Sequence, residues 1–426
     1  MTLPKRIHMV GIGGIGMSAL AQMLARKGIA VSGSDRDESP TTELLREKGI
    51  DVRIGHGEVP QDIELLVYSD AVPQENPERA AARERGVAKK SYFQVLGEIS
   101  RDMRTIAVAG THGKTTTTGM LTKILVDAGV SPTAIIGSIV KDFGSNFVAG
   151  TSEIFVVEAC EYRNHLLELS PEILVITNIE LDHTDFFPSL SALQETFKKA
   201  VARVPEGGVI IANTGDPRVA PVIAGARARV IDYTQKAIGS LQLVGEFNRE
   251  NGRAALCAAE AAVPSLSLEG GVASLASFKG SWRRFDYKGE TARGALVFDD
   301  YAHHPTAVKK TIAAAREKYP EKRIVVAFHP HLYSRTRDLF DAFVDALATA
   351  DRVLLAPIYA ARESDPGDIS SEILAEAIRV KNPEARAHES LAAVRDALEA
   401  ETSEGDLIIT MGAGDIYKIA EEIADE

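Results

Sequence analysis

The chain has 426 residues, 45% of them hydrophobic, which predicts two to four domains with real cores. Its 48 Lys and Arg against 60 Asp and Glu give a net charge of −12 without a basic run, which excludes nucleic acid as a main partner, and its two cysteines, Cys160 and Cys257, exclude a disulfide framework or zinc motif. No apolar run approaches the roughly 18–20 residues of a membrane span, and Met1–Arg6 is followed by a strand pattern rather than a signal peptide, so we expect a cytoplasmic protein.

The first predicted element is a strand at Ile7–Val10, followed by the glycine-rich turn Gly11–Gly16 and a helix that reaches Leu24. A second strand, 30–32, leads to Asp35. A GxGxxG turn with an acidic residue about 20 positions later is typical of dinucleotide sites. The pattern alone leaves open NAD(P), a nucleotide-linked substrate held by its diphosphate, or a turn that binds nothing.

Another predicted strand, Glu64–Ser69, ends in a turn-rich loop that runs to Pro77. Ligands of open α/β sheets bind at the carboxyl ends of strands, where this loop lies. Glu78–Glu84 is expected to be helical, and the first domain is expected to close near Met103.

A second glycine loop, Gly110-Thr-His-Gly-Lys114-Thr115, follows the predicted strand Thr105–Ala109 and precedes a helix that ends at Gly129. In such a loop, backbone N–H groups cradle phosphates, the Lys contacts the terminal phosphates and the Thr hydroxyl binds Mg²⁺. The full motif would have a glycine where Val108 stands. The sequence therefore predicts a nucleoside triphosphate site.

Two further strands of this second domain, 154–157 and 173–176, deliver polar residues at their ends. Glu158 follows the first, and the second leads to His183. A carboxylate and a histidine beside a phosphate loop suit a hard metal ion, although exposed loop ends are the simpler interpretation of each alone. A helix over 190–204, a strand over 209–212 and a helix that ends at Ala262 follow.

The pattern restarts around residues 282–286. Strands predicted at 295–298, 323–328, 352–355 and 407–410 are each followed by a polar loop, which predicts four strand–loop–helix units in a doubly wound sheet with one functional edge. Pro305 marks a helix start. Adjacent residues point in different directions, so we expect at most one of His303 and His304 to be catalytic.

The ordered set of motifs is more specific than any one of them. It comprises the Gly11–Gly16 turn, Gly110-Thr-His-Gly-Lys-Thr-Thr, Glu158-Ala-Cys-Glu161, Asn178-Ile-Glu-Leu-Asp-His183, Asn248 with Asn251, Arg284-Phe, Asp299-Asp-Tyr-Ala-His-His-Pro305 and Gly412-Ala-Gly-Asp415. This set resembles the Mur ligases over essentially the whole chain. The resemblance implies an α/β protein with a Rossmann-like UDP-sugar domain (1–103), a P-loop ATPase-like domain (104–286) and a doubly wound amino-acid domain (287–426).

The resemblance also implies an activity, in which ATP drives amide-bond formation between the lactyl carboxylate of UDP-N-acetylmuramate and L-alanine through an acyl phosphate. Mg²⁺, as two ions, would assist, and the chain would act as a monomer or weak homodimer. The stretch His331-Leu-Tyr-Ser-Arg335 favours L-alanine as the acceptor, while a peptide or another amino acid is the alternative. An NAD-dependent oxidoreductase would leave the Lys114-Thr115 loop without a task, as it would Glu158 and His183. A non-catalytic nucleotide-binding protein is disfavoured because these same residues are all intact.

The site residues that the resemblance implies fall into four groups. The UDP-sugar would be bound by Gly13, Gly14, Ile15, Gly16, Asp35, His56 and Ser69. ATP would be bound by Gly110, Thr111, His112, Gly113, Lys114, Thr115, Thr116, Asn248, Asn251, Arg284 and Asp300. Metal ions would be bound by Thr115, Glu158 and His183, and the amino acid by Tyr301, His303 and Arg335. Among them, Lys114, His183, His303 and Arg335 are the expected catalytic residues, with His303 as a base for the incoming amine.

Two features depart from the family pattern. The loop Glu158-Ala-Cys160-Glu161-Tyr-Arg163-Asn stands where these ligases usually have Glu-Ala-Asp-Glu-Ser-Asp, which loses two carboxylates and gains a cation. Lys198 lies about as far after His183 as the carbamylated lysine of relatives that add later amino acids. Either carbamylated Lys198 supplies charge missing near Cys160, or it is an exposed helix lysine.

Overall fold

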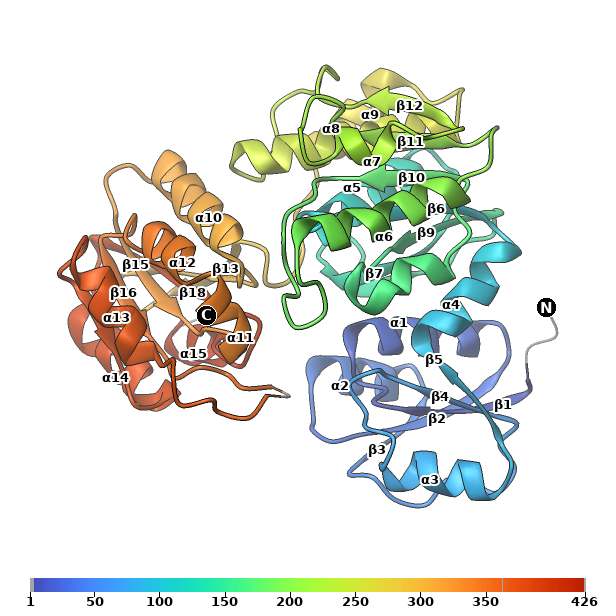
Figure 1. The fold of residues 1–426 in the computed structure, drawn as a ribbon, viewed down its shortest axis with the longest axis horizontal. Coiled ribbons are helices and arrows are strands. Elements are labelled where there is room, and N and C mark those ends of the chain that lie inside the picture. Colours follow the sequence, from blue (N-terminus) through green and yellow to red (C-terminus); the bar gives the residue numbers. More distant parts are fainter. Residues whose placement is uncertain (1–3, 362, 425–426) are drawn as a thin grey trace. The chain divides into compact units, whose positions relative to one another are not determined.

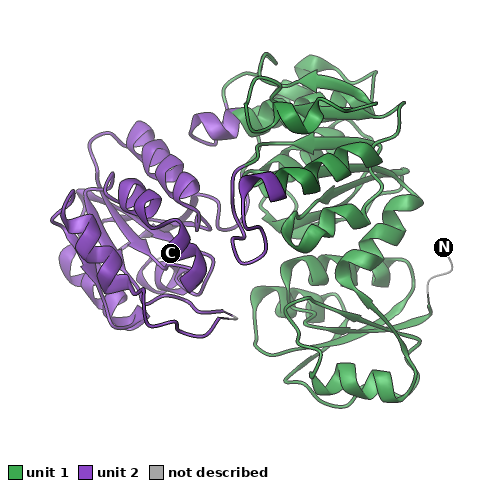
Figure 2. Cartoon of the chain, viewed as in Figure 1, with its two compact units in different colours: residues 1–179, 193–240, 250–279 green, residues 180–192, 241–249, 280–426 purple. Residues whose placement is uncertain are grey.

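The computed structural model describes residues 4–361 and 363–424, which form three β-sheets with flanking helices (Figure 1). Two compact units account for the chain (Figure 2). Unit 1 comprises residues 1–179, 193–240 and 250–279, and unit 2 comprises 180–192, 241–249 and 280–426. Each unit is described by itself.

The first sheet, in unit 1, has five parallel strands in the order β3-β2-β1-β4-β5. The strands are β1 (Arg6–Val10), β2 (Ala30–Asp35), β3 (Asp51–Ile54), β4 (Leu65–Tyr68) and β5 (Ala88–Ser91). The helices are α1 (Ile15–Arg26), α2 (Pro40–Glu47), α3 (Pro77–Glu84) and α4 (Tyr92–Arg101). The strand order reverses direction between β1 and β4, where ligands bind in such sheets.

The second sheet, also in unit 1, has seven strands in the order β12-β11-β10-β6-β9-β7-β8, and its edge strand β8 is antiparallel to β7. The strands are β6 (Arg104–Ala109), β7 (Thr133–Val140), β8 (Ser145–Val148), β9 (Ile154–Glu158), β10 (Ile173–Ile176), β11 (Val209–Ala212) and β12 (Arg229–Asp232). The helices are α5 (Lys114–Asp127), the 3₁₀-helix η1 (Tyr162–Glu168), α6 (Leu190–Arg203), α7 (Ala220–Ile223), α8 (Glu246–Ala262) and α9 (Leu268–Ala276). The predicted strands 105–109, 154–157, 173–176 and 209–212 are confirmed.

Helix α1 of the first sheet packs on β7 and β8 of the second sheet. Buried Gln22 on α1 donates to the side chain of Asn146 on β8 at 2.9 Å, and Asn146 donates back to the Ser18 hydroxyl at 2.8 Å. Buried polar groups that satisfy each other in this way favour one arrangement of the two sheets. The helix that follows the first glycine loop is thus fixed on the sheet that carries the second.

The third sheet, in unit 2, has six strands in the order β13-β14-β18-β15-β16-β17, with β13 antiparallel to β14. The strands are β13 (Asp286–Glu290), β14 (Leu296–Asp300), β15 (Arg323–Phe328), β16 (Arg352–Leu355), β17 (Ala385–Ala387) and β18 (Asp406–Met411). The helices are α10 (Pro305–Lys318), α11 (Tyr333–Asp338), α12 (Phe340–Leu347), α13 (Ser371–Arg379), α14 (Leu391–Glu401) and α15 (Tyr417–Ile423).

The expectation of four strand–loop–helix units in this sheet was wrong, because β13 and β17 are additional strands. β17 has only three residues, Ala-Arg-Ala, and β13 reads Asp-Tyr-Lys-Gly-Glu, so neither has the apolar run that identifies a buried strand. β14 also extends two residues further than predicted, so Asp299 and Asp300 end the strand instead of following it.

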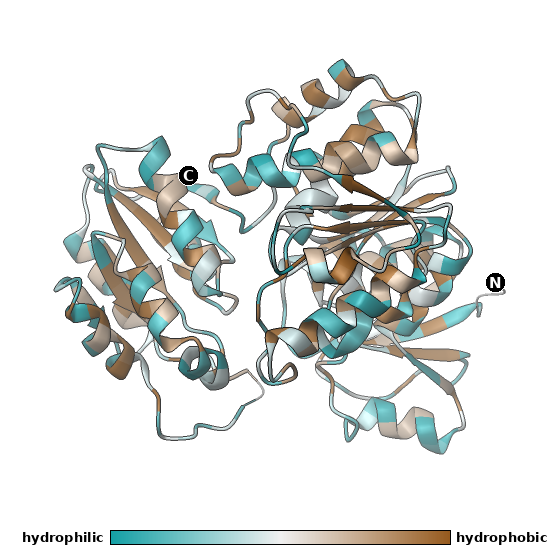
Figure 3. Ribbon diagram, turned by 45° about the horizontal axis from the view of Figure 1, so that its top comes forward, coloured by the Kyte–Doolittle hydropathy of each residue, from teal (hydrophilic) through white to brown (hydrophobic). Residues whose placement is uncertain are grey.

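Apolar residues line both faces of the third sheet, and Figure 3 shows its strands in brown between less hydrophobic helices. On one face, residues of α10, α12 and α13 pack against the strands, and on the other face α14 and α15 do so. Strands buried on both faces explain the continuous hydrophobic runs of β15 and β16. Among residues 4–361 and 363–424, no helix is both long and apolar enough to cross a membrane.

Candidate functional site

The first glycine loop connects β1 to α1 and is hydrogen-bonded to the carboxylate of Asp35. The Gly13 amide donates to Asp35 Oδ2 at 2.8 Å, and Asp35 Oδ1 accepts from the Arg36 amide. Gly16 lies so close to the Tyr92 ring that a β-carbon there would be 2.6 Å from the hydroxyl oxygen. The amides of Gly11 and Ile12 donate to the Ser34 carbonyl, and the Gly14 amide donates to the Gly11 carbonyl. The loop therefore has no room for a side chain at Gly16, and an anion would bind at the first N–H groups of α1.

Of the other residues expected to bind the UDP-sugar, Ser69 and His56 lie in the loops that follow β4 and β3. The strands are parallel, so both loops lie at the edge of the sheet that carries Gly11–Gly16. Ser69 is against Gly11, whose β-carbon would be 3.0 Å from the Ser69 β-carbon. The first sheet thus brings together the residues that the resemblance assigned to the UDP-sugar.

The second glycine loop connects β6 to α5 and is fixed by the end of β10. The Thr111 amide donates to the Asn178 carbonyl at 3.1 Å, and the His112 amide donates to the Asn178 side chain at 2.9 Å. Gly113 has a φ of 83°, which favours glycine, and its β-carbon would be 2.2 Å from Asn251 Oδ1. This is a cradle that only a glycine leaves open, as a phosphate loop requires.

Lys114 at the start of α5 forms a buried ion pair with Glu161. Its Nζ lies 3.0 Å from Glu161 Oε2, and it also donates to the Gly110 and Thr111 carbonyls. Burial alone would lower the pKa of Lys114, but the negative charge of Glu161, its hydrogen bond to Lys114 and the charges of neighbouring groups of the same loop together raise this pKa above its ordinary value. Lys114 is therefore a firmly charged cation next to the phosphate cradle.

Thr115 and Glu158 are the two residues of unit 1 that we expected to bind a metal ion, and their oxygen atoms lie together. The Thr115 hydroxyl donates to Glu158 Oε2 at 3.2 Å, and Glu158 Oε1 accepts from the Gly137 amide. Thr115 and Thr116 are buried in the first turn of α5. A hydroxyl and a carboxylate at this spacing are hard ligands that fit Mg²⁺.

The loop that departs from the family pattern has an unusual backbone. Arg163 and Asn164 both have left-handed φ angles, 50° and 63°, and Asn164 is held by a hydrogen bond from Thr196 at 2.6 Å. Burial, together with the negative charge of Glu161, raises the pKa of the Cys160 thiol to about 12. Cys160 is therefore neutral at pH 7.

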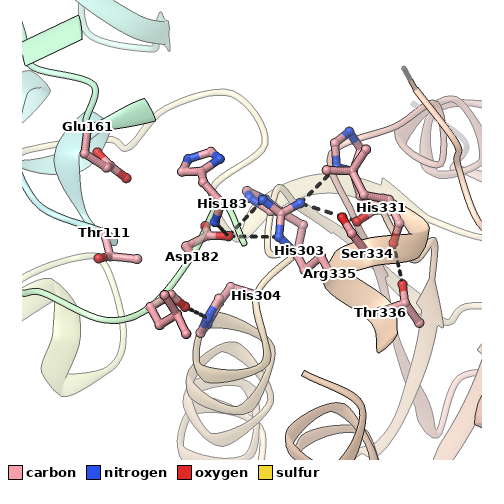
Figure 4. A network of polar contacts seen from close by, with 12 residues as sticks. Thr111, Glu161, Asp182, His183, His303, His304, His331, Ser334, Arg335 and Thr336 are labelled. Atoms are coloured by element: carbon pink, nitrogen blue, oxygen red, sulfur yellow. Dashed lines mark hydrogen bonds and ion pairs between the residues drawn. The ribbon is translucent and has the colours of Figure 1, made fainter. Parts of the chain in front are cut away.

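Unit 2 holds a second buried ion pair, between Arg335 on α11 and Asp182 (Figure 4). Arg335 donates to Asp182 Oδ1 at 2.9 Å and to His331 Nδ1 at 3.0 Å. Burial alone would raise the pKa of Asp182, but the charge of Arg335 and the nearby histidines lower it well below its ordinary value. The ion pair keeps Arg335 charged and holds its planar guanidinium in one orientation.

The two adjacent histidines make different hydrogen bonds. His304 caps α10, with its Nδ1 accepting from the Thr306 amide and its Nε2 next to the Leu181 carbonyl at 3.1 Å. His303 has its Nδ1 at 2.9 Å from the Tyr301 carbonyl. Burial, reinforced by the charge of Arg335, lowers the pKa of His303 well below its ordinary value, so its imidazole is neutral at pH 7.

The remaining residues expected at the nucleotide lie near the end of β14 and on α8. Burial raises the pKa of Asp300 to about 6, although the charge of Arg284 opposes this shift. The Arg284 guanidinium lies 5.0 Å from the Tyr301 ring centre. Asn248 donates to the Val244 carbonyl at 2.7 Å. Arg284, Asp300, Tyr301 and Asn248 all belong to unit 2.

Some expected neighbours are not brought together by a single unit. His183 is in unit 2, with a φ of 53° and its amide on Asp182, whereas Thr115 and Glu158 are in unit 1. Lys198 lies on α6, where its amino group is 2.6 Å from Glu195 and its side chain is 42% exposed. This is the environment of a surface lysine, and carbamylation of Lys198 stays a prediction.

Sequence reasoning missed the partners of the two cations. Glu161 and Asp182 stand inside the recognised motifs, but only the fold shows that they pair with Lys114 and Arg335. The signal that could have found them is charge, since a buried lysine or arginine needs a carboxylate and each of these lies in a polar loop beside the site.

Comparison with known proteins identifies the family of this chain. The Mur ligase family, catalytic domain, matches residues 6–104; the Mur ligase middle domain matches 108–240; and the Mur ligase, glutamate ligase domain, matches 283–414. UDP-N-acetylmuramate–L-alanine ligase of Clostridium perfringens is 38% identical, covering 98% of this chain and 97% of that protein.

Two solved structures resemble the whole chain. A UDP-N-acetylmuramate-alanine ligase from Thermotoga maritima superposes with a TM-score of 0.82 at 26% identity, covering 98% of each chain. A murein peptide ligase from Psychrobacter arcticus, at 24% identity and a TM-score of 0.76, covers 99% of this chain and all of its own, and shares the fold. Because family models match along its length and a relative is 38% identical over 98% of it, the chain belongs to the Mur ligase family.

Proposed function

We propose that this protein is an ATP-dependent carbon–nitrogen ligase that joins L-alanine to the lactyl carboxylate of UDP-N-acetylmuramate in peptidoglycan precursor synthesis. The observation that carries the proposal is the 38% identity to an L-alanine ligase over 98% of the chain. The phosphate cradle with Lys114, which such a ligase needs for ATP, is in place.

The sugar nucleotide would bind to the first sheet. Its diphosphate would lie beside Gly13, Gly14, Ile15 and Gly16, where the start of α1 attracts an anion. Asp35, His56 and Ser69 would contact the uridine. Asp35 accepts from the Gly13 amide, which supports a role in shaping this loop as well as in binding.

ATP would bind to the loop 110–116, with Lys114 on its terminal phosphates and Asn251 against Gly113. Asn248, Arg284 and Asp300 would position the nucleotide. A carboxylate that attacks a γ-phosphate is an anion that approaches an anion, so Lys114 must neutralise charge in the transition state. Mg²⁺ on Thr115 and Glu158, with a second ion on His183, would supply further charge neutralisation.

L-alanine would bind in unit 2. Arg335 would take its carboxylate, and Tyr301 and His303 would frame its amino group. The amine must attack as a neutral group, and neutral His303 has a lone pair that can accept its proton. Because the pKa of His303 is low, this transfer would be weakly driven and would serve orientation as much as proton removal.

The arrangement of the chain is part of the proposal. We assign the domains as 1–103, 104–286 and 287–426, the protein to the cytoplasm, and its state to a monomer or weak homodimer. The interpretation of Lys198 as a carbamylated lysine would require it to leave Glu195, so we assign it no catalytic step.

Phosphate release with ATP, Mg²⁺ and UDP-N-acetylmuramate, scanned over single amino acids and short peptides, tests the function. We expect turnover that depends on all three substrates and is strongest with L-alanine. Preference for a peptide acceptor would replace L-alanine in the proposal, and ATP turnover without the sugar nucleotide would contradict it.

A further inference from the structure

The first sheet contains a buried carboxylate that the proposed reaction does not use. Glu78, in the first turn of α3, has no exposed side-chain surface. Its Oε1 accepts from the Gly57 amide at 3.0 Å and lies 3.8 Å from His8 Nε2. Its Oε2 accepts from the Ser34 hydroxyl and lies 3.4 Å from His56 Nδ1.

Glu78 is ionised under all ordinary conditions. Burial would raise its pKa, but His8 at 3.8 Å and the hydrogen bonds from Ser34 and the Gly57 amide together outweigh burial and lower the pKa to about 2. An ionised carboxylate has no proton to donate, so it can only accept hydrogen bonds. The single hydroxyl proton of Ser34 is therefore committed to Glu78.

This commitment fixes the proton of the His56 ring. His56 Nδ1 lies 3.2 Å from Ser34 Oγ, which can then act only as an acceptor, and 3.4 Å from Glu78 Oε2, which is always an acceptor. Both neighbours thus require a proton on Nδ1. In the neutral ring, Nε2 then carries a lone pair and no proton.

The position of His56 at the sheet edge indicates which group the Nε2 lone pair can bind. His56 follows β3, and β3 lies beside β2, with Asp35 paired to Ile54 in the register of the two strands. A nucleotide whose diphosphate lies at the end of β1 passes Asp35 at the end of β2 and reaches the end of β3 with its base. The His56 side chain is 26% exposed there.

We infer that Glu78 is a positioning residue for base recognition: directly and with Ser34, it holds His56 in the Nδ1–H tautomer, so that Nε2 accepts the N3–H of uracil. Cytosine has an unprotonated N3 and offers no such donor, so this arrangement selects uridine over cytidine nucleotides. The inference rests on the proposed function, because it assumes that the first sheet binds a sugar nucleotide.

Direct binding of UDP and CDP tests the selectivity. The titrations use the full chain with the second glycine loop filled by Mg²⁺ and a non-hydrolysable ATP analogue, so that the first sheet alone takes up the nucleotide. We expect the wild type to bind UDP at least about 10-fold more tightly than CDP, the size of one lost buried hydrogen bond. Nitrogen-15 NMR of the histidine rings should show His56 in the Nδ1–H tautomer.

Three variants separate positioning from a purely structural role. Glu78→Gln offers an amide that can donate to the ring, so we expect the tautomer to change and the UDP-to-CDP preference to fall about 10-fold. Ser34→Ala leaves Glu78 Oε2 beside Nδ1, so the tautomer should persist. Glu84→Gln, on the exposed side of the same helix, is the matched control and should change neither.

The outcomes distinguish the inference from the function. Equal binding of UDP and CDP by the wild type, or a wild-type Nε2–H tautomer, would overturn the inference, and neither result depends on the variants folding. A tautomer and a preference that both survive Glu78→Gln would overturn it too. Failure of the wild type to bind UDP and UDP-N-acetylmuramate would instead contradict the proposed function.

Discussion

Lys114 in unit 1 and Arg335 in unit 2 are both assigned to anionic groups of substrates, and both are held by a carboxylate of the protein. The Lys114 side chain is 18% exposed and its Nζ lies 3.0 Å from Glu161. The Arg335 side chain is 4% exposed and lies 2.9 Å from Asp182. The distances are nearly equal, but the two cations are constrained differently.

Lysine carries a point charge on a flexible stem, so Nζ can turn from Glu161 and the loop carbonyls toward a phosphate with little rearrangement. The guanidinium of Arg335 is a planar fork whose nitrogens already engage Asp182 and His331. Turning it would break several bonds at once. We therefore expect Lys114 to act by moving between partners and Arg335 to act in place.

The largest effect is expected for Lys114→Ala. A cation that stabilises phosphate charge in the transition state is lost, which should lower turnover about 10³-fold, equal to about 4 kcal/mol. Phosphate release under saturating substrates measures it. Lys123→Ala, on the same helix, is the control and should change turnover less than about 2-fold, because its partner Asp127 makes an ordinary i,i+4 pair.

The second largest effect is expected on stability, for Asp182→Asn. The substitution leaves the buried Arg335 charge uncompensated, which should lower the free energy of unfolding by about 3 kcal/mol. Urea unfolding followed by circular dichroism measures it. If Arg335 could leave its pocket as easily as Lys114 turns, the loss would be under about 1 kcal/mol, and the contrast between the two cations would fail.

The direction in which the pKa of Asp182 shifts determines how the loss of stability in Asp182→Asn depends on pH. The pKa of Asp182 lies well below its ordinary value in the folded protein, so the stability it contributes is fully present above the unfolded pKa of about 3.9. That contribution is lost as the pH falls through the lower folded pKa. The difference between wild type and Asp182→Asn should thus stay constant from pH 8 to pH 5 and shrink only below about pH 4.

A smaller effect is expected for Glu161→Gln. An amide can still accept from Lys114, but the charge is lost, which should lower the free energy of unfolding by about 2 kcal/mol. In the proposed function Lys114 turns to phosphate when ATP binds, so turnover at saturating ATP should fall less than about 10-fold. A turnover loss as large as that of Lys114→Ala would mean that Glu161 takes part in the reaction.

The pH dependence of the stability that the Lys114–Glu161 pair contributes has the opposite sign to that of Asp182. Glu161 raises the pKa of Lys114, so the stability of the pair is present below the unfolded lysine pKa of about 10.4 and is lost as the pH rises through the folded value. The difference between wild type and Glu161→Gln should be constant between pH 7 and pH 9 and narrow above about pH 10.4.

How much the sequence predicts differs between these regions for a physical reason. The strands β6, β9 and β10 and the glycine loops were predictable, because apolar runs and turn glycines are local signals. The hairpin of β7 and β8 was not anticipated, since its polar Asn146 is buried through a hydrogen bond to Gln22, more than a hundred residues away. Such pairing has no local signature.

The same limit applies to the site. The phosphate loop and Glu158 follow from spacing, and the structure gives each a geometry that suits its role. The partners Glu161 and Asp182, and the acceptor chain from Glu78 to His56, depend on which loops meet at a sheet edge. Sequence spacing identifies the residues that carry chemistry better than the residues that hold them.

The smallest effect is expected for Cys160→Ser, in the loop that departs from the family pattern. Burial and the charge of Glu161 raise the pKa of the Cys160 thiol to about 12, so the group is neutral at pH 8 and contributes no charge to Lys114 or Glu158. A serine of similar size should leave turnover within about 2-fold, and iodoacetamide at pH 8 should label Cys160 only after unfolding.

Mass spectrometry of the alkylated native protein, beside an unfolded sample, measures that labelling. Rapid labelling of native Cys160 with loss of turnover would mean that a thiolate stands in for the usual carboxylate. Retained turnover in Cys160→Ser would place the negative charge that stabilises charged Lys114 on the carboxylates of this loop, chiefly Glu161, and not on Cys160. Lys114 would then be held by the carboxylate of Glu161 until a phosphate replaces it. The planar guanidinium of Arg335 is instead held in place by both Asp182 and His331.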